Sequence, residues 1–216
     1  MDFKEVAEQL HKPEGELGKQ VGEKMNHTNE IMNLSCIRLL TPESNDTILE
    51  IGMGNGLFCK YLLGSAPRIR YTGCDFSETM IQEATQVNQS FVETGQAHFL
   101  LGDAMALPLA DNLFTKAFTV NTLYFWQDPP KVLAEIRRVL QPGGKLLIAI
   151  RSKEVMQHLP FVSFGFHLYS PDEVSELLSQ NGFAAISIHE IPEPEQTIHG
   201  QVLKMDSVII SGVRVV

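Results

Sequence analysis

Residues 48–56 read ILEIGMGNG, an apolar run that ends in three glycines separated by single residues. The apolar run predicts a buried β-strand, and the glycines predict a tight turn that leads into a helix. Glycine at such a turn also lets the backbone come close to a ligand, because no Cβ stands in the way. This stretch therefore predicts an α/β fold with a ligand site at the carboxyl end of its first strand.

The spacing of these glycines separates two classes of ligand. Dinucleotide-binding loops carry the pattern G-x-G-x-x-G, whereas here the glycines are Gly52, Gly54 and Gly56, followed by Leu57. Glu50, at the tip of the strand, would repel a diphosphate but can hold an amino group or a cation. No Gly-Lys-Ser/Thr follows, so the P-loop pattern is absent as well. The loop thus indicates a ligand less anionic than a dinucleotide.

The rest of the chain alternates apolar strands with helices. Four further strands are expected, at residues 69–74, 97–101, 114–120 and 145–150. Apolar strands separated by helices are typical of a parallel sheet covered on both faces. Residues 184–190 and 207–215 are strand-like with no helix between them, so they are expected to pair antiparallel. The sequence predicts a Rossmann-like, seven-stranded, mostly parallel α/β sheet with an antiparallel C-terminal strand.

The N-terminal part has a different pattern. Residues 2–41 carry apolar side chains near helical spacing, which predicts a helical extension. Residues 12–22, with one proline and three glycines, are expected to interrupt it as a loop. We therefore expect one compact domain in two parts, a helical cap over residues 1–45 and a ligand-binding domain over residues 46–216.

Composition narrows the class of partner. The 216 residues carry a formal net charge of −9 at pH 7, which disfavours nucleic acid, because neutralising phosphates takes a basic face. Three single cysteines argue against a disulfide framework or a zinc site, so no metal is expected. The apolar runs are too short to cross a bilayer, and the charged N-terminus lacks the apolar stretch of a signal peptide. We expect a cytoplasmic monomer or homodimer that acts on a small molecule.

Four segments, in order along the chain, resemble one family. Residues 50–56 look like motif I of the class I S-adenosylmethionine-dependent methyltransferases, in particular the small-molecule group similar to ubiquinone/menaquinone-biosynthesis methyltransferases. Residues 71–77 (YTGCDFS) resemble the family's second-strand motif with its acidic end, and residues 101–104 (LGDA) resemble its adenine-site motif. Residues 135–144 (EIRRVLQPGG) resemble the helix and turn before the fifth strand. The four motifs together are specific.

The resemblance implies the cofactor S-adenosyl-L-methionine and a role for each matching residue. Asp75 would accept both ribose hydroxyls, and Phe76 would stack along the adenine. Asp103 would accept from the adenine amino group, while the backbone N–H of Ala104 would donate to the ring. Asn121 would hold the methionine end. The expected cofactor-binding residues are Glu50, Gly52, Gly54, Gly56, Asp75, Phe76, Asp103, Ala104 and Asn121.

The resemblance also implies methyl transfer to a small-molecule acceptor by in-line displacement. The protein then has to align the acceptor and exclude water. Acceptor-side residues are expected from the N-terminal helices, the loop after the fourth strand and the aromatic-rich residues 152–170. Candidates for a general base are His27, Tyr124 and His167, although an amine or thiolate acceptor needs none. Many family members have a histidine pair after the fourth strand, where this chain reads NTLYFW, so the resemblance does not identify the acceptor.

Two other functions stay open from the sequence. A methyltransferase fold that only binds the cofactor could act as a sensor or support a partner enzyme. A nicotinamide-dependent oxidoreductase would share the fold, but the glycine spacing and the lack of a Tyr-x-x-x-Lys pair count against it.

Overall fold

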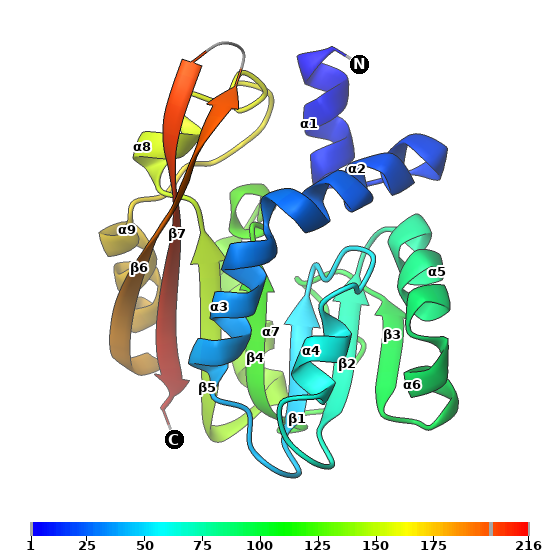
Figure 1. Cartoon of the computed structure of the whole chain (residues 1–216). Helices are drawn as coiled ribbons and strands as arrows, with labels where there is room; N and C mark the ends of the chain where they lie inside the picture. Colours follow the sequence, from blue (N-terminus) through cyan, green and yellow to red (C-terminus); the bar gives the residue numbers. More distant parts are fainter. Residues whose placement is uncertain (1, 199–200, 216) are drawn as a thin grey trace.

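A seven-stranded sheet runs through the computed structural model, which describes residues 2–198 and 201–215 (Figure 1). Its strands are β1 (Thr47–Ile51), β2 (Arg70–Asp75), β3 (Ala97–Leu101), β4 (Phe114–Val120), β5 (Leu140–Ile150), β6 (Phe183–Ile198) and β7 (Gln201–Arg214). The helices are α1 (Phe3–His11), α2 (Gly15–Thr28), α3 (Glu30–Leu40), α4 (Cys59–Leu63), α5 (Glu78–Val87), α6 (Gln89–Glu93), the 3₁₀ turn η1 (Leu123–Phe125), α7 (Pro129–Val139), α8 (Lys153–Met156) and α9 (Pro171–Gln180).

The order of the strands determines where a ligand can bind. The sheet order is β3-β2-β1-β4-β5-β7-β6, with parallel pairing from β3 to β5 and antiparallel pairing of β7 with β5 and β6. From β1 the chain builds first toward β2 and β3 and then returns to β4 on the other side. Ligands of open α/β sheets bind at such a switch point, outside the carboxyl ends of the strands. The glycine turn after β1 lies at this point.

Both faces of the sheet are covered, because successive residues of a buried strand point in opposite directions. Ile48 packs with Met32 and Leu62 of the helices on one face. Leu49 packs with Leu133 and Leu178 of the helices on the other face. The predicted α/β fold, with its antiparallel C-terminal strands, is confirmed.

Predicted strand limits agree best where the apolar run is short and bounded by turns. The predictions at residues 97–101 and 114–120 coincide with β3 and β4, and the apolar run that begins at residue 48 lies in β1. β5 begins earlier than predicted because Leu140 pairs with Phe114 before a register shift. β6 and β7 form a much longer hairpin than predicted. Pro192 is tolerated in β6 because that strand lies at the edge of the sheet.

The expectation of a loop over residues 12–22 is wrong, since α2 begins at Gly15. A Cβ on Gly18 would lie 2.6 Å from the carbonyl carbon of Pro13, and one on Gly22 would lie 3.3 Å from Sδ of Met80. These glycines therefore permit close packing of a helix, where their low helix propensity suggested a break. Figure 1 shows α1 and α2 lying beyond the carboxyl ends of β1 and β2. Among the residues that the structure describes, no helix has the length and apolarity to span a bilayer.

Candidate functional site

The turn after β1 has three glycines, and a side chain at each would meet different surroundings. Gly52, Gly54 and Gly56 have φ angles of 69°, 58° and 67°, in the left-handed region that side chains disfavour. A Cβ on Gly52 would clash with Cγ2 of Thr122, and one on Gly56 would lie 3.0 Å from Cβ of Ala84. A Cβ on Gly54 would have no neighbour within 4 Å. Gly52 and Gly56 thus allow protein packing, whereas Gly54 faces open space.

Asp75, the last residue of β2, is bonded to the same turn. One carboxylate oxygen accepts from the Gly54 N–H at 3.2 Å, and the other accepts from the Ser77 N–H at 2.9 Å. Burial raises the pKa of Asp75 to about 6, although the bonds from Ser77 and Gly54 oppose the shift. A carboxylate has about four lone-pair sites, so Asp75 can still accept from a ligand.

Glu50, near the tip of β1, is buried beside a hydroxyl. Tyr71 donates to Oε2 of Glu50 at 2.6 Å. Burial raises the pKa of Glu50 to about 8; the Tyr71 bond opposes the shift and the nearby Asp75 adds to it. No bond from the described residues reaches the other carboxylate oxygen, and Glu50 lines the cavity described next. An incoming ammonium group would therefore find an acceptor there.

A cavity of about 260 Å³ lies over the glycine turn, between the carboxyl ends of the strands and the helices α1 and α2. Of the nine residues expected to bind the cofactor, eight line it: Glu50, Gly52, Gly54, Asp75, Phe76, Asp103, Ala104 and Asn121. Gly56 is not among the lining residues. The fold thus brings to one cavity residues from four separate segments of the sequence.

The turn after β3 supplies the adenine-site candidates. Asp103 is exposed, and its carboxylate accepts from the Met105 N–H at 2.8 Å. This bond fixes the turn that carries the Ala104 N–H. Phe76, which directly follows β2, also lines the cavity and has 41% of its surface exposed. The ring and the turn present the apolar face and the polar groups that a purine needs.

Comparison with known proteins adds sequence evidence to this geometry. Residues 49–148 match the family model of a methyltransferase domain. An O-methyltransferase of Aspergillus nomiae is 32% identical over 151 residues, which cover 67% of this chain and 67% of that protein. The chain belongs to the class I S-adenosylmethionine-dependent methyltransferases.

Other relatives of this methyltransferase agree with that assignment. An O-methyltransferase of Pyrenophora dematioidea is 30% identical over 178 residues, covering 79% of this chain and 66% of that protein. A ubiquinone/menaquinone biosynthesis C-methyltransferase of Paracoccus denitrificans is 35% identical over 123 residues, covering 56% of this chain and 48% of that protein. A solved S-adenosylmethionine-dependent methyltransferase of Aquifex aeolicus shares the fold, with a TM-score of 0.68, 19% identity and 100% of both chains covered. This chain spans only 58% to 67% of the length of four fungal O-methyltransferases that it matches.

The three candidates for a general base lie outside the cavity of the methyltransferase. The hydroxyl of Tyr124 is buried, accepts from the Arg151 N–H at 2.6 Å and lies 3.2 Å from Oδ1 of Asn121. His27 lines a second hollow, which adjoins the first at Asn26 and Phe58. His167 is exposed, and its backbone N–H donates to the Tyr124 carbonyl at 3.0 Å. Their catalytic roles stay predictions.

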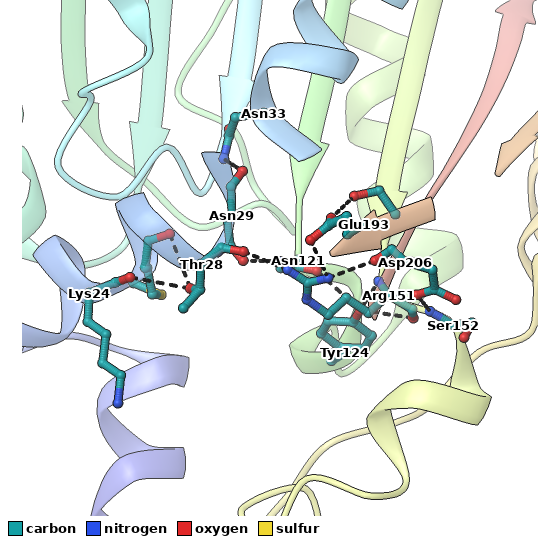
Figure 2. A network of polar contacts seen from close by, with 12 residues as sticks. Lys24, Thr28, Asn29, Asn33, Asn121, Tyr124, Arg151, Ser152, Glu193 and Asp206 are labelled. Atoms are coloured by element: carbon teal, nitrogen blue, oxygen red, sulfur yellow. Dashed lines mark hydrogen bonds and ion pairs between the residues drawn. The ribbon is translucent and has the colours of Figure 1, made fainter. Parts of the chain in front are cut away.

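Asn121 connects the cavity with the helices that cover it. Its Nδ2 donates to Oδ1 of Asn29, between α2 and α3, at 3.1 Å (Figure 2). Beside it, the Arg151 guanidinium donates to the Thr28 carbonyl at 2.6 Å and pairs with Glu193 at 3.1 Å. The junction of α2 and α3 is thus bonded both to Asn121, which lines the cavity, and to Arg151, just after β5.

Two cavity residues escape sequence reasoning. His11 ends an amphipathic helix, and no local pattern indicates which part of the sheet lies opposite that end. Phe125 lies in the NTLYFW segment, where Tyr124 and Trp126 are equally aromatic neighbours; only the 3₁₀ turn decides which ring faces the cavity. Trp126 lines the cavity as well, whereas Tyr124 does not.

Proposed function

We propose that this chain binds S-adenosylmethionine in the cavity over β1 and transfers its methyl group to a small-molecule acceptor. The observation that carries the proposal is the open space at Gly54, in the cavity that the side chains of Asp75 and Glu50 also line. The Asp75 carboxylate can accept hydrogen bonds from the two hydroxyls of a ribose, and Glu50 can accept from an ammonium group. Together they match a ligand with a ribose and an amino-acid end.

The fit assigns a part of the cofactor to each element. Asp75 would accept from the ribose hydroxyls, and Phe76 would stack on the adenine, whose amino group and ring Asp103 and the Ala104 N–H would bind. Glu50 and Asn121 would hold the methionine end. Support comes from the shared cavity and from the hydrogen bond that already joins Gly54 to Asp75.

When bound, the cofactor supplies an activated methyl group, so the chain need not build an electrophile. The residues of the cavity have to hold the acceptor in line and keep water out, which can contribute roughly 7–11 kcal/mol to lowering the barrier. Residues 1–45 act in this proposal as a cap, because α1 and α2 form the side of the cavity opposite the strands.

The proposal also covers the kind of methyl acceptor and the cell compartment. A formal charge of −9 favours a small-molecule acceptor over nucleic acid. All three cysteines are free and buried, which favours a cytoplasmic setting.

Calorimetry with S-adenosylhomocysteine tests the first half of the proposal, with NADH as the matched negative ligand. We expect micromolar binding of S-adenosylhomocysteine and no binding of NADH; the reverse would identify an oxidoreductase. Incubation with methyl-labelled S-adenosylmethionine and a metabolite extract tests the second half. Label in an extracted compound supports catalysis, whereas binding without any labelled product would identify a sensor.

A further inference from the structure

His11, the last residue of α1, is one of the residues that line the cavity. Its imidazole stacks on the ring of Phe125 with centroids 4.9 Å apart and an interplanar angle of 26°, and its centroid lies 5.3 Å from that of Phe76. Phe76 directly follows β2, Phe125 follows β4, and β1 lies between these strands in the sheet. A ring that contacts both phenylalanines therefore connects the segments that follow β2 and β4, the two neighbours of β1.

The ring nitrogens of His11 are available to a ligand. Within residues 2–198 and 201–215, no hydrogen bond joins either nitrogen to the protein, although the ring lines the cavity. Burial, together with the charge of Lys12, lowers the pKa of His11, so the imidazole is neutral at pH 7 and keeps a lone pair. The charge of Lys12 is the one that acts on its ring, and the carboxyl groups of Glu50, Asp75 and Asp103 line the same cavity.

The other ionisable groups of the cavity cannot serve as a neutral base. Glu50 is bonded to Tyr71, Asp75 is bonded to Gly54, and Asp103 accepts from the Met105 N–H, so each carboxyl group already has a partner in the protein. Burial raises the pKa of the Cys74 thiol to about 12, which keeps it protonated. Among the described lining residues, His11 is thus the one side chain that is basic near neutral pH and unpaired.

The walls beside His11 indicate the chemistry of the acceptor. They include Leu10, Phe125, Trp126 and Val132, all of which line the cavity. Aromatic and aliphatic walls stabilise a flat apolar molecule, and a single basic nitrogen among them suits one acidic hydroxyl.

Resting on the proposed function, we propose that His11 binds the hydroxyl of a planar aromatic acceptor and removes its proton during methyl transfer. The O–H bond breaks and its proton passes to the free nitrogen of the imidazole. The oxygen uses its electron pair to form the O–CH₃ bond, while the pair of the S–CH₃ bond stays on sulfur and turns the sulfonium into a neutral thioether. The imidazolium then returns its proton to water.

The test uses 2-naphthol as the probe, 2-methoxynaphthalene as the matched probe without a proton, and His11→Phe, which keeps a ring but removes the nitrogens. We expect the complex of the wild-type chain with S-adenosylhomocysteine to bind 2-naphthol at least tenfold more tightly than 2-methoxynaphthalene in calorimetry. In His11→Phe this preference disappears, while the affinity for S-adenosylhomocysteine stays within about twofold. With S-adenosylmethionine, the kcat for forming 2-methoxynaphthalene falls roughly 10²-fold or more, as loss of a general base predicts.

Two results would overturn the inference. One is an unchanged preference for 2-naphthol in His11→Phe, and the other is a wild-type complex that does not bind 2-naphthol. Either result leaves the proposed function standing as long as the wild-type chain binds S-adenosylhomocysteine. If that first binding step fails, the proposed function itself fails.

Discussion

The guanidinium of Arg151, just after β5, donates to the carbonyl oxygen of Thr28 at the end of α2, with 2.6 Å between the two atoms. The same guanidinium forms a salt bridge with Glu193, and the two side chains are only 6% and 2% exposed. Figure 2 shows these groups meeting beside Asn121. One buried cation thus joins the N-terminal helices, the central sheet and the C-terminal hairpin.

Arg151→Met is expected to lower the free energy of unfolding by about 3–5 kcal/mol, because it leaves the Glu193 carboxylate buried without its partner. Urea unfolding measures the change. The matched control is Lys4→Met, which removes an exposed ion pair with Glu8 and should change stability by less than about 1 kcal/mol. Adding Glu193→Gln to Arg151→Met should restore part of the loss. If Arg151→Met and Lys4→Met lower the free energy of unfolding equally, the buried ion pair stabilises the fold no more than the exposed one.

Gly54→Ala should weaken S-adenosylhomocysteine binding at least tenfold, because the new methyl group enters the space proposed for the cofactor. Gly95→Ala is the matched control, since Gly95 also has a positive φ (70°) and no atom within 4 Å of an added Cβ, but lies away from the cavity. Both variants should lose roughly 1 kcal/mol of stability from backbone strain. Calorimetry separates them: normal binding by Gly54→Ala would mean that the cofactor does not use this turn.

Asp75→Ala is expected to reduce S-adenosylhomocysteine affinity by about 1–3 kcal/mol, since the ribose hydroxyls lose a charged acceptor. The control is Asp128→Ala, which removes a carboxylate that also accepts a backbone N–H, here from Lys131, but lies outside the cavity. That control should cost about 1 kcal/mol of stability and leave affinity unchanged. Unchanged affinity in Asp75→Ala would remove Asp75 from the site.

Stability without ligand should fall as pH rises, and Glu50 should cause part of the fall. Its folded pKa of about 8 lies above the value of about 4.3 for an unfolded chain, so the native state holds the extra proton between these values. The stabilisation is complete below about pH 4 and is lost as pH rises through 8. Asp75 adds a similar fall that ends near pH 6. Melting temperatures between pH 5 and 9 should therefore decline less in Glu50→Gln; parallel curves would contradict the assignment.

The sequence predicted those helices and strands whose ends are set by neighbouring residues, such as turns and helix caps. β1, β3 and β4 are short apolar runs between turns, and α9 begins at a Ser170 cap with Pro171 after it. Prediction failed where a distant contact decides the structure. Gly18 and Gly22 lie inside a helix because Pro13 and Met80 pack against them, and the long β6–β7 hairpin continues past the sheet toward the cap.

The residues of the candidate site divide in the same way, into those that a local motif predicts and those that only the tertiary structure brings together. The glycine turn, Asp75 and Asp103 come from motifs with fixed positions at strand ends, and all three segments reach one cavity. His11 ends α1, which is far from Phe125 in the sequence, so only the tertiary structure brings the two rings together. Tyr124 has the chemistry of a base in the sequence, but its hydroxyl is bonded to the Arg151 backbone.

A crystal structure with S-adenosylhomocysteine tests the central claim most directly. We expect the ribose hydroxyls within hydrogen-bond distance of the Asp75 carboxylate, the amino-acid end beside Glu50 and the backbone of Gly54 in contact with the ligand. Density for the nucleoside away from the tip of β1, or a cavity filled by side chains of the chain itself, would contradict the account.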